Sequence, residues 1–126
     1  MQEHGYYSVK LEQNLLNITL VGSLNEQAAG TACQQIKASI VGLHGDKVVV
    51  LVNCLDYQGS TPQAHQISNQ TLNWLNQQNC VARATVYKEK IHQDIVKHQQ
   101  PEIFGMKNRR EFHCFDEARQ WLLAQL

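Results

Sequence analysis

The sequence contains few prolines and few charged residues, and its charges balance. Only 2 of the 126 residues are proline, and 17% are charged. Eleven basic and eleven acidic side chains leave no net charge when the histidines are neutral. A nucleic-acid-binding domain normally carries a concentrated positive charge. We therefore expect no nucleic acid partner.

Closely spaced cysteines and long apolar runs are also missing. The four cysteines, Cys33, Cys54, Cys80 and Cys114, form no CxxC pair, and each lies among apolar residues. This pattern predicts four small buried side chains in a reducing compartment. No apolar run approaches the length of a membrane span, and no signal peptide precedes the first expected strand. We expect a cytoplasmic protein without stable membrane insertion.

Sequence motifs for the common enzyme classes are absent. There is no P-loop, no dinucleotide fingerprint, no nucleophile elbow and no pair of catalytic carboxylates. The six histidines lack the spacing of metal ligands: His92 and His98, for example, fall on different faces of a helix. We expect neither a cofactor nor a metal, and a binding domain rather than an enzyme.

The most informative segment present is an apolar, valine-rich run at residues 47–55. It follows a Gly45-Asp46 turn and precedes the polar residues 56–62. Such a run predicts a strand buried on both faces, as in the centre of a parallel sheet.

Shorter periodic segments surround this strand. Alternating apolar residues predict an opening hairpin, and helical spacing predicts helices that begin after Asn25, near Pro62 and after Asp116. The order is β-β-α-β-α-β-α-β-α, which predicts an α/β fold: one domain over residues 1–126, with a mostly parallel five-stranded mixed sheet. The hairpin occupies residues 7–11 and 16–20, the later strands residues 81–87 and 111–115, and the third helix residues 89–99.

This order resembles the STAS superfamily, and most closely its SpoIIAA-like (STAS/SEC14-like) branch. The resemblance covers nearly the whole chain and is carried by four segments of low individual specificity. These are residues 20–24 before the first helix, the strand at 48–55, the turn Gly59-Ser60-Thr61-Pro62, and the final strand and helix at 112–122.

The resemblance also implies a regulatory serine, with one departure. Anti-sigma factor antagonists carry Asp-Ser-Ser-Gly at the start of the second helix, where one serine is phosphorylated. Here Gln58 and Gly59 precede Ser60 and Thr61, so no acidic residue stands directly before the hydroxyl pair. The two hydroxyls also fit helix caps, either as a Ser60-x-x-Gln63 capping box or with Thr61 before Pro62.

The candidate site is the segment after the central strand, residues 56–63, which we call the rim. Ligands of open α/β sheets usually bind at the carboxyl ends of the strands. We expect Asp56, Tyr57, Gly59, Ser60 and Thr61 to bind a ligand or accept a phosphate there, although ordinary loop polarity and helix capping also explain them.

A second candidate is the apolar loop that contains Ile103, Phe104 and Met106. Such a loop fills the core, covers a pocket or contacts a partner. The basic run 107–110 after it fits a solvated loop better than a phosphate-binding surface.

Together these features favour a regulatory or binding domain. It would act at the rim through protein–protein contact or a small apolar or anionic ligand, and a homodimer is plausible. The alternative is a small enzyme with Cys54, Asp56 or Ser60 as the reactive group.

Overall fold

A computed structural model describes residues 2–89 and 108–126 of the chain. The five strands lie in the sheet in chain order; β1 pairs antiparallel with β2, and all other neighbours are parallel. The expected mixed α/β sheet is therefore confirmed. The elements are β1 (Tyr6–Glu12), β2 (Leu15–Leu24), α1 (Glu26–Val41), β3 (Val48–Ser60), α2 (Pro62–Leu75), β4 (Cys80–Tyr87), β5 (Arg109–Phe112) and α4 (Phe115–Leu123).

Two predicted features lie outside the described residues. One is the body of the third helix, expected at residues 89–99. The other is the apolar loop with Ile103, Phe104 and Met106.

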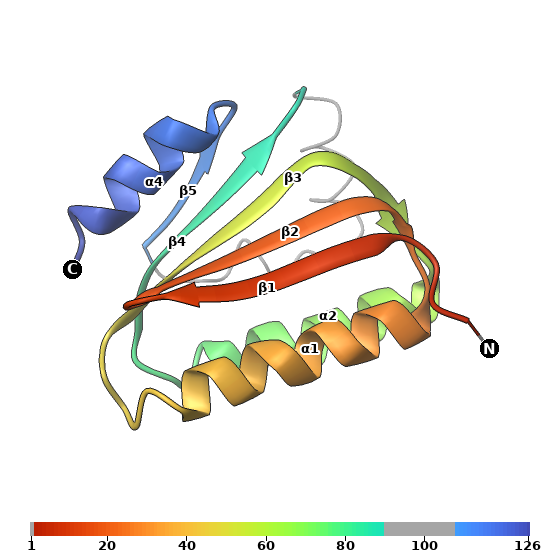
Figure 1. Cartoon of the computed structure of the whole chain (residues 1–126), viewed down its shortest axis with the longest axis horizontal. Coiled ribbons are helices and arrows are strands. Elements are labelled where there is room, and N and C mark those ends of the chain that lie inside the picture. The colour runs from red at the N-terminus through yellow and green to blue at the C-terminus, as the bar shows by residue number, and fades with distance from the viewer. Residues whose placement is uncertain (1, 90–107) are drawn as a thin grey trace.

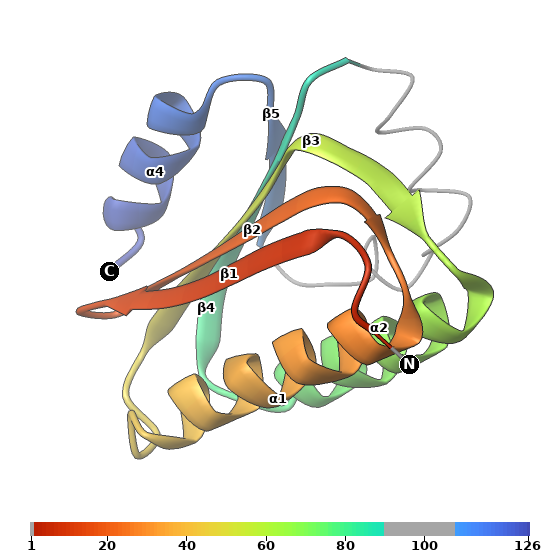
Figure 2. The ribbon, with the colours of Figure 1, turned by 45° about the vertical axis from the view of Figure 1, so that its right-hand side comes forward.

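Helices cover both faces of the sheet (Figures 1 and 2). Helices α1 and α2 lie side by side on one face, and α4 lies on the other. Each face has its own core, because successive residues of a strand point to opposite sides. Val48 and Val50 face α1 and α2, whereas Val49 and Leu51 face α4, and all four are at most 2% exposed. This burial confirms that the valine-rich run is a central strand.

Strand β3 is longer than the sequence predicted. We expected it to end at Leu55 and to be followed by a loop, but it continues to Ser60 and stays paired with β2. The polar residues 56–60 gave no strand signal. Pairing with the long strand β2 supplies the backbone hydrogen bonds that keep them extended.

Irregular pairing bends this last part of β3. Between Asn53 and Asp56, and again between Tyr57 and Gly59, β3 contains one more residue than the paired stretch of β2. Extra residues of this kind are β-bulges, which increase twist and interrupt side-chain alternation. Cys54 and Tyr57 consequently both face α1 and α2, although they are three residues apart. Gly59 has a φ of +124°, which a residue with a Cβ rarely adopts.

The starts of α1 and α2 agree with the sequence, and the start of α4 does not. Asn25 and Thr61 are N-caps whose side chains accept hydrogen bonds from the amides of Ala28 and Ala64. The cap of α4 is Cys114, without a side-chain hydrogen bond, so Asp116 was wrongly expected to cap it. Asp116 instead lies in the first turn, where its carboxylate still faces the positive helix end.

The end of the chain differs in two further respects. The last strand covers residues 109–112 rather than 111–115. Cys114, expected to be buried, is exposed, and Cys80 is half-buried, whereas Cys33 and Cys54 are buried as expected. Cys114 is exposed because it occupies the junction between β5 and α4 and packs in neither element.

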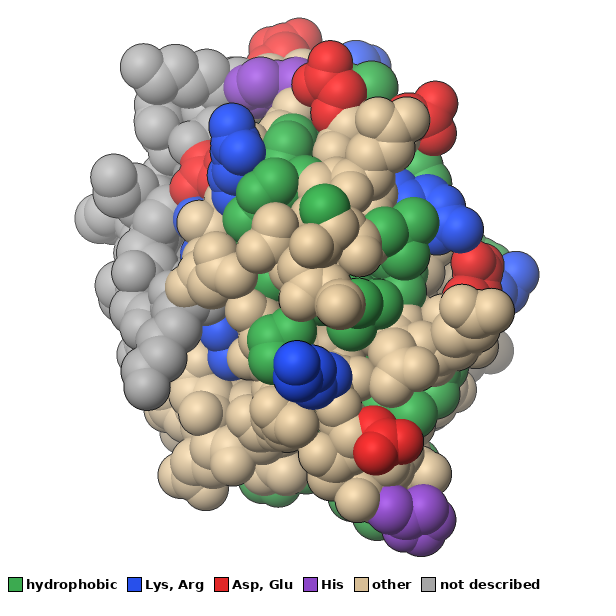
Figure 3. All heavy atoms as spheres, turned by 90° about the vertical axis from the view of Figure 1, so that its left-hand side faces the viewer, with side chains coloured by type: hydrophobic (Ala, Val, Ile, Leu, Met, Phe, Trp, Pro, Cys, Tyr) green, Lys and Arg blue, Asp and Glu red, His purple; other side chains and the backbone are tan. Residues whose placement is uncertain are grey.

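Side chains of both charges are mixed on the face that Figure 3 shows. Hydrophobic side chains lie between them in small groups. Among the described helices, none is both long and apolar enough to cross a bilayer.

Candidate functional site

Helices α1 and α2 begin next to each other at one end of the sheet. β2 leads into α1 and β3 leads into α2, and these strands are parallel neighbours. The amide of Thr61 donates a hydrogen bond to the carbonyl oxygen of Leu24 at 3.0 Å, which joins the two strand ends. The fold therefore brings two helix N-termini to the carboxyl ends of β2 and β3.

An open hollow of about 400 Å³ lies at this point. None of its described lining residues is acidic. Asn25 also fixes the N-terminal segment beside it: its Oδ1 accepts from the amide of His4 at 3.1 Å, and its Nδ2 donates to the carbonyl of Gln2 at 2.8 Å. The lining residues are His4, Ser23, Leu24, Asn25, Gln58, Gly59, Ser60 and Thr61.

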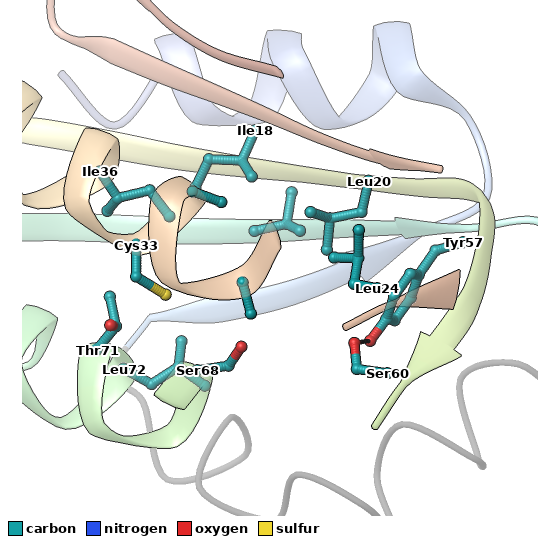
Figure 4. A pocket seen from close by; sticks show the side chains of 13 residues that line it. Ile18, Leu20, Leu24, Cys33, Ile36, Tyr57, Ser60, Ser68, Thr71 and Leu72 are labelled. Atoms are coloured by element: carbon teal, nitrogen blue, oxygen red, sulfur yellow. Dashed lines mark hydrogen bonds between the residues drawn. The ribbon is translucent and has the colours of Figure 1, made fainter. Parts of the chain in front are cut away.

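Behind the hollow, a cavity of about 100 Å³ lies between the sheet and the two helices (Figure 4). Leu24 and Ser60 line both spaces, so the hollow and the cavity are neighbours. Most of the cavity wall is aliphatic. The lining residues are Ile18, Leu20, Leu24, Ala29, Ala32, Cys33, Ile36, Val52, Tyr57, Ser60, Ser68, Thr71 and Leu72.

Tyr57 and Ser60 meet at the end of the cavity nearest the hollow (Figure 4). Their hydroxyl groups are hydrogen-bonded to each other. Burial raises the pKa of Tyr57 to about 12, so the phenol is protonated at neutral pH.

Three further polar side chains face the cavity away from this end. They are the thiol of Cys33 on α1 and the hydroxyls of Ser68 and Thr71 on α2. Burial raises the pKa of Cys33, and Ser68 and Thr71 are close enough to act against this rise. The apolar cavity therefore has one wall of weak hydrogen-bonding groups.

The structure distributes the predicted site residues unequally. Gly59, Ser60 and Thr61 line the hollow, and Tyr57 with Ser60 lines the cavity. Asp56 is exposed and lines neither space. The bulge explains this separation, because it turns Tyr57 inward.

Cys54 has the wrong environment for a nucleophile. Only 4% of it is exposed, and burial raises the pKa of its thiol to about 12. A reactive cysteine requires a lowered pKa and access to substrate.

Sequence reasoning missed the cavity residues on the helices. We expected Cys33 only as a small buried side chain and assigned no role to Ser68 or Thr71. The available signal was the gathering of small polar residues on the inner faces of two helices, where larger aliphatic residues normally fill the core. No three potential metal ligands cluster within residues 2–89 and 108–126.

Comparisons with known proteins identify the architecture. The sequence matches no protein-family model and no curated protein. In structure it is similar to an uncharacterized protein of the DUF3478 family from Shewanella loihica PV-4, described as having a SpoIIAA-like fold. The TM-score is 0.71 at 13% identity, over 97% of this chain and 96% of that one.

The fold is SpoIIAA-like. This finding agrees with the resemblance inferred from the sequence. At this level of identity the similarity establishes a fold and leaves the activity to the residues of the site, since one fold supports many functions.

Proposed function

We propose that this protein is a non-catalytic binding module that recognises a polar or anionic group in the hollow at residues 58–61. The observation that carries the proposal is the convergence of two strand ends and two helix N-termini around one open space. Helix N-termini favour negative charge because their first amides have no partner within the helix.

The composition of the hollow supports this ligand class. Its described lining contains hydroxyl, amide and imidazole side chains and no carboxylate that would repel an anion. The side chains of Asn25 and Thr61 each satisfy one helix amide, those of Ala28 and Ala64. Pro62 has no amide hydrogen, so the amides of Glu26, Gln27 and Gln63 remain to donate to a ligand or to water.

The residues at the junction argue against the enzymatic alternative. A serine nucleophile needs a base that can accept its proton. The partner of Ser60 is the hydroxyl of Tyr57, which is a protonated phenol at neutral pH and a poor base. Cys54 is buried and protonated, and Asp56 lies outside the hollow.

The proposal is tested by titrating isotope-labelled protein with sodium phosphate at constant ionic strength and recording amide chemical shifts. We expect saturable shifts at residues 24–28 and 59–64. The variant Gln58→Glu places a negative charge in the hollow and should weaken the binding. Gln77→Glu makes the same change at an exposed residue after the C-terminal end of α2 and should leave it unchanged.

Two outcomes would overturn the proposal. One is the absence of saturable shifts for phosphate, acetate and sulfate alike. The other is an equal response of both glutamate variants, which would mean that the anion responds to net charge and not to the hollow.

A further inference from the structure

The cavity behind the hollow indicates what the rest of the ligand is. We propose that it accepts a short, unbranched aliphatic chain whose polar or anionic head lies in the hollow. The inference concerns the ligand class, and the position of the head rests on the proposed function.

The first argument is the shape of the space. The cavity runs from Tyr57 and Ser60, next to the hollow, to Ile36 and Thr71 between the two helices (Figure 4). A smaller space of about 50 Å³ adjoins that far end, but Arg83, Thr85 and Arg109 also line it, so the aliphatic part of the space ends there. An elongated space of this kind fits a linear chain better than a ring system.

The second argument is the size of the space. An apolar cavity of roughly 150 Å³ engineered in another protein stays dry and binds benzene. The cavity here, of about 100 Å³, therefore has room for a chain of about four carbons.

The third argument is the chemistry of the wall. Ile18, Leu20 and Leu72 offer an aliphatic surface. Alternative filling by ordered water requires two to four polar partners for each molecule. The hydroxyl of Thr71 is already bonded to the carbonyl of Ile67, and those of Tyr57 and Ser60 to each other. The remaining polar partners are few, so an apolar occupant is favoured.

The boundary between the cavity and the hollow determines where the head group of the ligand lies. Leu24 and Ser60 border both the cavity and the hollow. A chain that enters past them leaves its terminal group among the residues of the hollow. A straight-chain carboxylate of intermediate length has both required parts.

The test is a calorimetric or NMR affinity series with acetate, butanoate, hexanoate, octanoate and decanoate, all below their micelle concentrations. Each added methylene should tighten binding about fourfold while it enters the cavity. The gain should stop near hexanoate, when the space is full.

Two alanine variants on one helix locate the chain. Ala32 lines the cavity and Ala38 is exposed on the opposite face of α1. Ala32→Leu should weaken hexanoate binding roughly fifteenfold, equivalent to excluding about two methylenes, and should leave acetate unchanged. Ala38→Leu should bind each carboxylate of the series with the wild-type affinity. If Ala32→Leu does not fold, Ser68→Leu fills the same space from a half-buried position on α2.

The outcomes separate the two proposals. Affinity that does not depend on chain length, while phosphate and acetate still perturb the hollow, overturns the inference and leaves the proposed function standing. If affinity rises with chain length equally for carboxylates and for the matching alcohols, the result supports chain binding in the cavity and contradicts an anionic head group. If both Ala32→Leu and Ser68→Leu keep the wild-type dependence of affinity on chain length, the chain binds elsewhere and the inference is overturned.

Discussion

The two faces of the sheet are packed differently. On the α4 face, alanines at Ala82 and Ala84 bring the sheet close to Ala118 of the helix, and all three are at most 1% exposed. At the edge, Arg110 lies over the ring of Phe112 at 5.5 Å. The face covered by α1 and α2 instead contains an elongated cavity and several polar groups.

This difference in packing agrees with the proposed binding function. Close packing of small and branched side chains stabilises the α4 face. On the other face, the positions between the sheet and the helices include serine, threonine and cysteine, and the space remains incompletely filled. A closely packed interior has few voids of this size, which supports the proposal that the α1–α2 face binds a ligand while the α4 face stabilises the fold.

The largest expected effect compares one leucine from each face. Leu51 is fully buried in β3 against α4, whereas Leu72 is half-buried beside the cavity. Leu51→Ala should reduce the free energy of unfolding by about 2–5 kcal/mol. Leu72→Ala should cost less than half as much. Urea denaturation of both variants measures the difference, and equal costs would mean that the faces are equally well packed.

Alkaline pH should also destabilise the α1–α2 face selectively, because Cys54 and Tyr57 are both buried there. Burial raises the folded-state pKa of Cys54 from 9.0 to about 12. The unfolded thiol therefore loses its proton first. The contribution of the buried, neutral thiol to the free energy of unfolding is therefore complete below about pH 9, and it is lost as the pH rises toward 12.

Removing that thiol should flatten the pH dependence. In Cys54→Ala, the loss of unfolding free energy between pH 8 and 11 should shrink by on the order of a few kcal/mol. Urea titrations at several pH values check this. As a control, Cys114→Ala removes an exposed thiol and should reproduce the wild-type slope. A wild-type slope in Cys54→Ala would contradict the expected burial effect.

Adding two methyl groups should have opposite consequences on the two faces. Ala82→Val overpacks the α4 face, where Ala82 is fully buried, and should cost about 1–3 kcal/mol. Ala32→Val enters the cavity and should change stability by less than about 0.5 kcal/mol, or increase it. Thermal and urea unfolding compare the pair. A large cost for Ala32→Val would show that the cavity has no room for a side-chain atom, and therefore none for a ligand.

The smallest effect concerns the helix caps. Thr61 caps α2 with a side-chain hydrogen bond, and Cys114 caps α4 without one. Thr61→Ala should lower the free energy of unfolding by about 1 kcal/mol, and Cys114→Asp should raise it by roughly 0.5–1 kcal/mol. Urea denaturation measures both. A gain from Thr61→Ala would contradict the role of Thr61 as a cap.

Local signals in the sequence predicted much of the fold. The valine run at 48–52 indicated a central strand because only a strand buried on both faces is apolar at every position. Asn25, and Thr61 before Pro62, indicated helix starts because these residues satisfy amides that the helix leaves without partners.

The inner part of the site was not predictable in this way. The inward position of Tyr57 depends on two extra residues in β3 relative to β2, and register between separate strands leaves no local pattern. The cavity depends on four elements, with Ile18 from β2, Cys33 from α1, Val52 from β3 and Ser68 from α2. Their side chains meet only after the helices pack on the sheet. The exposure of Cys114 likewise follows from where β5 ends.

The most direct test of the binding face is a set of intermolecular NOEs between hexanoate and methyl-labelled protein. We expect contacts from the chain to the methyl groups of Ile18, Ile36 and Leu72, and chemical shift changes at the amides of residues 59–61. Leu122, a buried residue of α4 on the opposite face of the sheet, should give none. NOEs to Leu122 without NOEs to Ile18 and Ile36 would contradict the assignment of binding to the α1–α2 face.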